Sequence, residues 1–128
     1  MLGYIFFEGK FVPRDKNKSL YYLTLAANQN ILDAQYTLGL IYFYGDFVPR
    51  DINKSLYYLT LAANSNHPSS QTMLGSIFYN GELVPRNINK AIHYFAIAAE
   101  KNDLTALYNI GLIYHEGKYI ERDINKMS

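Results

Sequence analysis

The chain has 128 residues, of which 49% are hydrophobic and 18% are charged, and its formal net charge is +1. This length is enough for one continuous core. The complete lack of cysteine excludes disulfides, cysteine-ligated zinc and a thiol nucleophile, and the near-zero net charge argues against a protein that binds nucleic acid or an anionic membrane through bulk charge.

All eight glycines fall on one 36-residue period, as Gly3, Gly39, Gly75 and Gly111 and as Gly9, Gly45, Gly81 and Gly117. A fixed period of this length is typical of stacked units, each of which leaves an apolar face for its neighbours to cover. Each period reads as two helices, helix A and helix B. We therefore predict an all-α repeat array over residues 1–128, with a partial repeat at 1–30, repeats at 31–66 and 67–102, and a partial repeat at 103–128.

In chain order, residues 1–9 match the end of a helix A, and the first helix B follows from Asp15 to Asn30. The next helix A is predicted over Leu32–Tyr44. A loop containing Val48-Pro49-Arg50 leads to a helix B from Asp51 to Asn66. The same order then recurs, with helix A starting at Pro68, helix B at Asn87, helix A at Asp103 and a stub of helix B at Asp123.

Recurring residues mark the helix ends. The Gly45 series stands where a helix ends through the left-handed region, and the Asn66 series plays that part for helix B. Asp51 and its equivalents are good N-caps. Gly39 and Gly75 differ because they fall in mid-helix, at a cost of about 1 kcal/mol relative to alanine. This recurring cost predicts a neighbouring helix that passes too close for a side chain.

The pattern LGxxYxxG, followed by a D/N-x-x-K-[AS] helix that ends in AA, resembles the Sel1-like repeat, a relative of the tetratricopeptide repeat. The resemblance covers the whole chain. It departs from the family where Tyr22, Tyr58 and Tyr94 replace a common tryptophan and where Glu121 replaces the loop proline. The resemblance implies a right-handed α/α superhelix, a solenoid that serves as an adaptor or scaffold.

Candidate chemistry is sparse. His67, His93 and His115 fall at three different repeat positions, so they form no helix-spaced ligand pair, and we interpret them as surface or helix-start residues. No arrangement indicates catalysis. We predict no catalytic residues, no metal and no cofactor.

A basic residue recurs twice in every unit, as Arg14, Arg50, Arg86 and Arg122 and as Lys18, Lys54, Lys90 and Lys126. Such a row suits a phosphate-rich partner. Ion pairing across units or hydrogen bonding within the loops explains it without a ligand, and we favour that interpretation.

Sequence differences between the units distinguish residues that maintain the scaffold from residues that are candidates for recognition. Residues 9–30 and 45–66 differ at three of 22 positions, whereas residues 31–44 and 67–80 agree at only four of 14. In tetratricopeptide repeats the helices A line the groove, so the resemblance implies that the variable face is the recognition surface here too. The predicted partner-binding residues are Tyr36, Leu40, Phe43, Tyr44, Thr72, Ser76, Tyr79, Asn80, Tyr108, Leu112, His115 and Glu116.

Two functions remain open. The first is a non-catalytic interaction module that binds a peptide or a partner helix, with no nucleic acid and no membrane insertion. The second is a regulatory or substrate-recruiting fragment of a larger enzyme or complex. We expect a cytoplasmic protein, since no signal peptide or membrane span is evident. Apolar faces at both ends predict that the array belongs to a longer one or self-associates.

Overall fold

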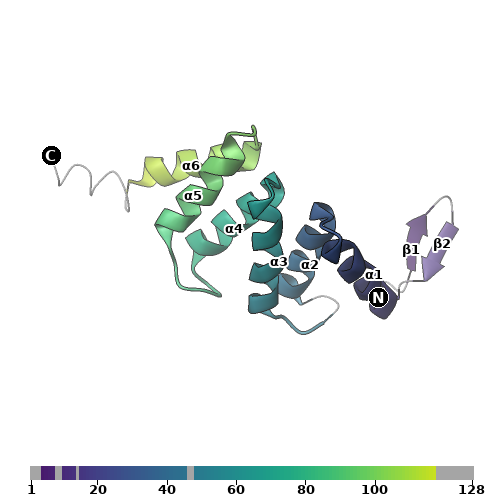
Figure 1. Ribbon diagram of the computed structural model, residues 1–128. Coiled ribbons are helices and arrows are strands. Elements are labelled where there is room, and N and C mark those ends of the chain that lie inside the picture. The colour runs from purple at the N-terminus through teal and green to yellow at the C-terminus, as the bar shows by residue number, and fades with distance from the viewer. Residues whose placement is uncertain (1–3, 8–9, 14, 46–47, 118–128) are drawn as a thin grey trace.

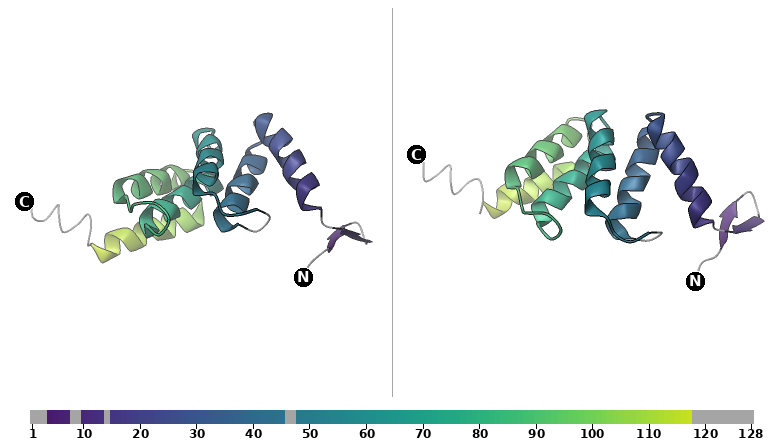
Figure 2. Two further views of the ribbon diagram at one scale, coloured as in Figure 1. Left: turned by 90° about the horizontal axis from the view of Figure 1, so that it is seen from below. Right: turned by 60° about the horizontal axis from the view of Figure 1, so that its bottom comes forward.

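The computed structural model describes residues 4–7, 10–13, 15–45 and 48–117 (Figure 1). Within these ranges the chain forms β1 (Tyr4–Phe7), β2 (Lys10–Pro13), α1 (Lys16–Asn28), α2 (Leu32–Tyr44), α3 (Ile52–Asn64), α4 (Pro68–Asn80), α5 (Ile88–Ala99) and α6 (Leu104–Glu116). The even-numbered helices are helices A and the odd-numbered ones helices B. Each helix packs against the helices before and after it in the chain, which confirms the helical repeat solenoid (Figure 2).

Helix ends follow the repeat. Helices α2, α4 and α6 end at Gly45, Gly81 and Gly117, whose φ angles are 72°, 67° and 64°. The turns after helices B pass through Asn30, Asn66 and Asn102, with φ angles of 64°, 70° and 63°. These are the left-handed conformations that glycine and asparagine tolerate best, so the predicted ends are confirmed.

All the described helices except α2 begin with a side-chain cap, and α2 has Ile31 at that position, which makes no such bond. Asp15, Asp51 and Asn87 each accept a hydrogen bond from the backbone N–H three residues later, and Asp103 does the same at the start of α6. Each bond satisfies an amide that has no partner inside the helix. The predicted stub of helix B with its cap Asp123 lies outside the described residues, as do Gly3, Gly9, Arg14, Glu121, Arg122 and Lys126.

The two mid-helix glycines are contact points between helices. A Cβ atom placed on Gly39 would lie 2.6 Å from Leu59 Cγ, and one placed on Gly75 would lie 2.6 Å from Phe95 Cδ1. Leu59 is 0% exposed and Phe95 1% exposed, so neither side chain has free space to withdraw into. The prediction of a close neighbouring helix is confirmed, and that neighbour is the following helix B.

Polar and aromatic contacts also join α2 to α3. The Ser55 hydroxyl, fully buried, donates to the Gly39 carbonyl at 2.7 Å. The rings of Tyr42 and Tyr58 stack at 6.3 Å, and the Lys54 ammonium lies 5.1 Å from the Tyr42 ring centroid. The α4–α5 pair repeats the stack with Phe78 and Tyr94, and Lys90 lies over Phe78.

The start of the chain differs from the prediction. Instead of ending a helix A, Tyr4–Phe7 forms a strand that pairs antiparallel with Lys10–Pro13, with Ile5 opposite Val12 (Figure 1). Tyr, Ile and Phe, which make up Tyr4–Phe7, are strong strand formers. The local preference therefore prevails over the repeat pattern.

The glycine contacts generate a stability prediction. Gly39→Leu should lower the free energy of unfolding by about 3 kcal/mol, because the new side chain collides with the buried Leu59. Gly111 occupies the same repeat position, but no described atom lies within 4 Å of a Cβ placed there. Gly111→Ala should therefore raise helix stability by up to about 1 kcal/mol. Denaturant titration followed by circular dichroism measures both, and an equal effect of the two changes would contradict this packing account.

Candidate functional site: two clefts between the helices A

Two neighbouring clefts open between successive helices A. The α2/α4 cleft has a volume of about 220 Å³ and is lined by Phe43, Tyr44, Met73, Ser76, Ile77, Asn80, Glu82 and Leu83. The α4/α6 cleft has a volume of about 190 Å³ and is lined by Ser76, Tyr79, Asn80, Phe95, Asn109, Leu112, Ile113 and Glu116. Ser76 and Asn80 line both clefts, so the C-terminal half of α4 forms the wall between them.

The linings combine apolar walls with a few polar groups. Phe43 and Leu112 supply apolar surface, while Asn80 and Asn109 present amides that can donate and accept. Each cleft also holds one carboxylate, Glu82 in the first and Glu116 in the second. The described lining residues include no lysine or arginine. The Arg86 guanidinium lies next to the second cleft, 5.4 Å from the centroid of the Tyr79 ring.

One lining carboxylate is held in place by a tyrosine. The Tyr79 hydroxyl donates to Glu116 Oε1 at 2.5 Å, and this bond joins α4 to α6 along the edge of the second cleft. Tyr79 is half-buried and packs against the core cluster around Phe95. Its ring is therefore part of the scaffold of the cleft as well as its surface.

The predicted partner-binding residues are distributed unevenly over these clefts. Those that line a cleft are Phe43, Tyr44, Ser76, Tyr79, Asn80, Leu112 and Glu116. Tyr36 is half-buried against the core cluster that contains Leu59 and Leu74, and Leu40 is half-buried. Thr72 is only 9% exposed. Tyr108 and His115 are exposed, and neither lines a cleft.

Other lining residues escaped the sequence analysis. Met73 and Asn109 occupy one repeat position, which holds threonine in α2, so the variability used to select the other residues marks this position as well. Glu82 and Leu83 lie in the loop after α4, where a search confined to helices A does not reach. Phe95 and Ile113 are core residues that form the floor of the α4/α6 cleft.

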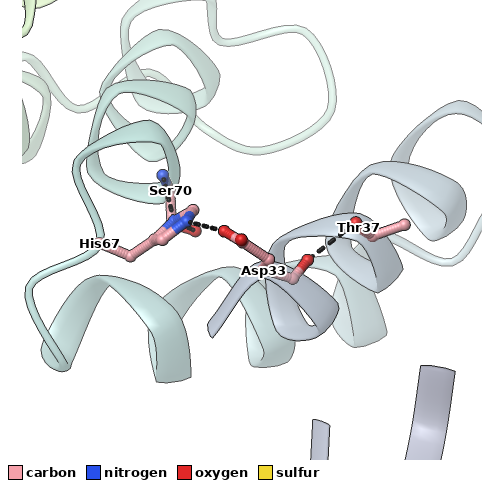
Figure 3. Close-up of polar contacts among 4 residues, drawn as sticks. All are labelled: Asp33, Thr37, His67 and Ser70. Carbon is pink, nitrogen blue, oxygen red and sulfur yellow. Dashed lines mark hydrogen bonds and ion pairs between the residues drawn. The ribbon is translucent and has the colours of Figure 1, made fainter. Parts of the chain in front are cut away.

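At the opposite ends of α2 and α4, a histidine joins the two helices (Figure 3). His67 caps α4, since its Nδ1 accepts from the Ser70 backbone N–H at 3.2 Å. This leaves the ring proton on Nε2, which lies 2.9 Å from the Asp33 carboxylate of α2. The Tyr36 ring lies 5.3 Å from the His67 ring. The prediction of a helix-start histidine is confirmed for His67.

The pKa of Tyr36 is shifted by burial and by groups on two helices A. Burial raises its pKa above the usual 10.0, and the nearby Tyr44 phenol and the Asp103 carboxylate raise that pKa further. Tyr36 and Tyr44 belong to α2, whereas Asp103 caps α6.

The basic row has structural partners. Arg50 Nε donates to the Phe43 carbonyl at 3.1 Å, and Arg86 Nε donates to the Tyr79 carbonyl at 2.7 Å, so each arginine satisfies a carbonyl near the end of a helix A. Lys54 and Lys90 lie over aromatic rings of helices A. Hydrogen bonding in the loops accounts for the described arginines without a ligand, as the sequence interpretation favoured.

Two further searches of the described residues bear on the kind of site. Within these residues, no group of three or more His, Asp or Glu side chains is arranged to hold a metal ion. None of the helices in the same ranges is long and apolar enough to span a membrane.

Comparisons with known proteins agree on one family. The Sel1 repeat model matches residues 1–31, 32–67, 68–103 and 104–126. A crystal structure of a Sel1 repeat protein from Oxalobacter formigenes is 33% identical over 90% of this chain and 47% of that one, with a TM-score of 0.79. The structure of c5321, a protective antigen present in uropathogenic Escherichia coli strains displaying an SLR fold, is 29% identical over 87% of this chain, with a TM-score of 0.80.

The chain thus spans about half the length of the first of these structures and 24% of the second. A comparison with curated protein sequences gives no match.

The tyrosine environments generate a prediction about alkaline pH. Burial raises the pKa of Tyr36 and also that of Tyr58, where Tyr42 and Tyr57 add to the effect. The unfolded chain therefore loses these two protons first, so their contribution to stability is complete below about pH 10 and is lost as the pH rises through the folded pKa. Combining Tyr36→Phe with Tyr58→Phe should reduce the fall in melting temperature between about pH 9 and about pH 11.

The control for this prediction is Tyr108→Phe. Tyr108 is 67% exposed, so its replacement should leave the alkaline slope as in the wild type. A double variant with an unchanged slope would show that these two phenols do not control the alkaline transition.

Proposed function

Because the chain belongs to the Sel1 repeat family, whose repeats mediate protein–protein interaction, we propose that it binds a peptide segment of a partner protein along the two clefts between α2, α4 and α6. The observation that carries this proposal is that the clefts are adjacent and share Ser76 and Asn80. Adjacent clefts suit a segment that places successive side chains in successive hollows.

The lining chemistry supports a peptide ligand. A peptide carries a backbone donor and acceptor at almost every residue, and the amides of Asn80 and Asn109 can pair with both. Apolar walls from Phe43 and Leu112 suit apolar side chains. Burial of such side chains supplies most of the binding free energy, and the polar groups select orientation.

The carboxylates define the charge of the partner. Glu82 and Glu116 lie at the two clefts, and the described lining residues offer no cation to neutralise an incoming acid. A lysine or arginine in the bound segment would pair with one of them. We therefore propose a segment with apolar residues flanking at least one basic residue. Its affinity would fall with added salt.

We propose a binding role and no catalytic role for these clefts. Their ionisable lining side chains are Tyr44 and Glu82 in one cleft and Tyr79 and Glu116 in the other, and Tyr79 already donates to Glu116. Recruitment of a partner to a larger assembly remains compatible with the proposal, since the two structural relatives are both longer than this chain. Whether the chain acts alone or within a larger assembly, the clefts would bind a segment of another protein.

A blocking substitution tests the proposal. Peptides that bind the protein are selected from a displayed library, and their affinities are measured by calorimetry. Ser76→Phe should fill space in both clefts and weaken binding at least about tenfold, which corresponds to about 1.4 kcal/mol. Asn80→Ala should weaken it by about 1 kcal/mol through a lost hydrogen bond.

The matched control is Tyr57→Ala, because Tyr57 is 60% exposed on α3 and lines neither cleft. It should leave the affinity unchanged. Unaltered binding by a folded Ser76→Phe variant would contradict the proposal, and loss of binding in variants of Arg50 or Lys54 would place recognition on the basic row instead.

A further inference from the structure

The wall between the two clefts ends in an asparagine that is followed by a glycine. Asn80 and Gly81 form the one asparagine–glycine pair in the sequence, at the end of α4. The other described helices A also end at a glycine, but a tyrosine or a glutamate precedes it there. Asn80 lines both clefts, so a chemical change in its side chain alters both of them at once.

Asparagine can lose its side-chain amide through attack by its own backbone. The backbone nitrogen of the following residue forms a bond to the side-chain carbonyl carbon, and ammonia leaves with the proton of that nitrogen, which closes a succinimide ring. Water then opens the ring at one of its two carbonyl carbons and gives aspartate or isoaspartate. A Cβ atom on the following residue hinders the attack, and glycine has none.

The structure leaves the Asn80 side chain open to this reaction. Asn80 is the last residue of α4 and is exposed, so water reaches its amide. That amide makes no hydrogen bond to any described residue, and it can therefore turn toward the following nitrogen. The loop after α4 is bonded to the carbonyls of Phe78 and Tyr79, which precede Asn80.

One backbone bond opposes the attack, and it is a long one. The Gly81 N–H donates to the Ile77 carbonyl at 3.3 Å, as the last bond of the helix. The equivalent bonds of Gly45 and Gly117 measure 2.9 Å and 3.2 Å. Helix ends open more readily than helix interiors. The attacking nitrogen is therefore the one that its helix holds at the greatest distance.

We propose that Asn80 is a self-modification site, which converts to aspartate or isoaspartate in the folded protein faster than any other described asparagine. Either product places a carboxylate on the wall that separates Glu82 in one cleft from Glu116 in the other. The wall then loses an amide donor and gains a negative charge. A newly made molecule and an aged one differ in the charge of both clefts.

One tryptic peptide tests the proposal, because residues 55–86 contain no internal lysine or arginine. This peptide holds Asn80 and also Asn64, which is the exposed last residue of α3 but is followed by Ser65. The folded full chain is incubated at mildly alkaline pH, which favours loss of the proton from the attacking nitrogen, and samples are digested at intervals for mass spectrometry. Asn80 should convert at least about tenfold faster than Asn64, because the Ser65 side chain hinders the attack. Equal rates, or an intact Asn80 where other asparagines convert, would overturn the proposal.

Two variants separate the effect of the structure from that of the dipeptide. Asn80→Gln should abolish the fast conversion, because attack on the longer side chain has to close a larger and slower-forming ring. Tyr44→Asn places the same dipeptide at the end of α2, where the glycine N–H is held at 2.9 Å. The new site should convert more slowly than Asn80 in the same molecule. Conversion at the same rate would overturn the part assigned to the helix-end bond.

The consequence for the clefts rests on the proposed function and has its own test. Asn80→Asp reproduces the aspartate product, and Asn80→Ala is the matched control without amide or charge. For a selected peptide with a basic residue, the drop in affinity from low to high salt should be at least about threefold larger with Asn80→Asp than with the wild type, because salt screens the added ion pair. Asn80→Ala should keep the salt dependence of the wild type.

The two proposals fail in different ways. A protein that converts at Asn80 but binds no displayed peptide would contradict the proposed function and leave the modification site established. A protein that binds peptides with the same salt dependence as its Asn80→Asp variant would overturn the charge effect assigned to both clefts.

Discussion

The close approach of α3 and α5 to the middle of the preceding helix A is the constraint on which the described array depends. It requires a residue without a side chain at Gly39 and Gly75, and it brings Leu59 or Phe95 against the helix backbone. That proximity in turn lets a small hydroxyl, Ser55, reach the Gly39 carbonyl and lets the aromatic rings stack beside it. The helical cost of a glycine is small compared with the burial of a leucine or phenylalanine that it permits.

The same constraint shapes the surface that carries the two clefts. Because helices B occupy the space next to the glycine face, the opposite face of each helix A is left to meet the next helix A. At one end of α2 and α4, the His67–Asp33 contact draws the helices together. At the other end they leave the α2/α4 cleft, and Asn80 and Ser76 divide it from the next one. Each of these helices A therefore has one packing face with nearly constant residues and one cleft face with variable residues, because the two faces contact different helices.

The sequence by itself determined the features that depend on local conformation or on a repeated contact. The sequence predicts the 36-residue period, the side-chain caps, and the glycines and asparagines that adopt the left-handed backbone conformation. Each of these features requires a particular residue type at a particular place. The close contact at Gly39 was predictable for the same reason, since an unfavourable helical residue recurs there. About half of the predicted recognition residues also lie in the clefts, because variability between units marks the face that packing leaves unconstrained.

Only the tertiary structure decided which variable residues reach solvent. Thr72 and Tyr44 are both variable positions of helices A, yet Thr72 is 9% exposed and Tyr44 56% exposed, because burial depends on how neighbouring repeats cover each turn. It also showed that Glu82 and Leu83 complete a cleft from a loop, and that Arg50 and Arg86 bond to helix carbonyls. At the chain start, Tyr4–Phe7 pairs as a strand although its sequence matches that of a helix A.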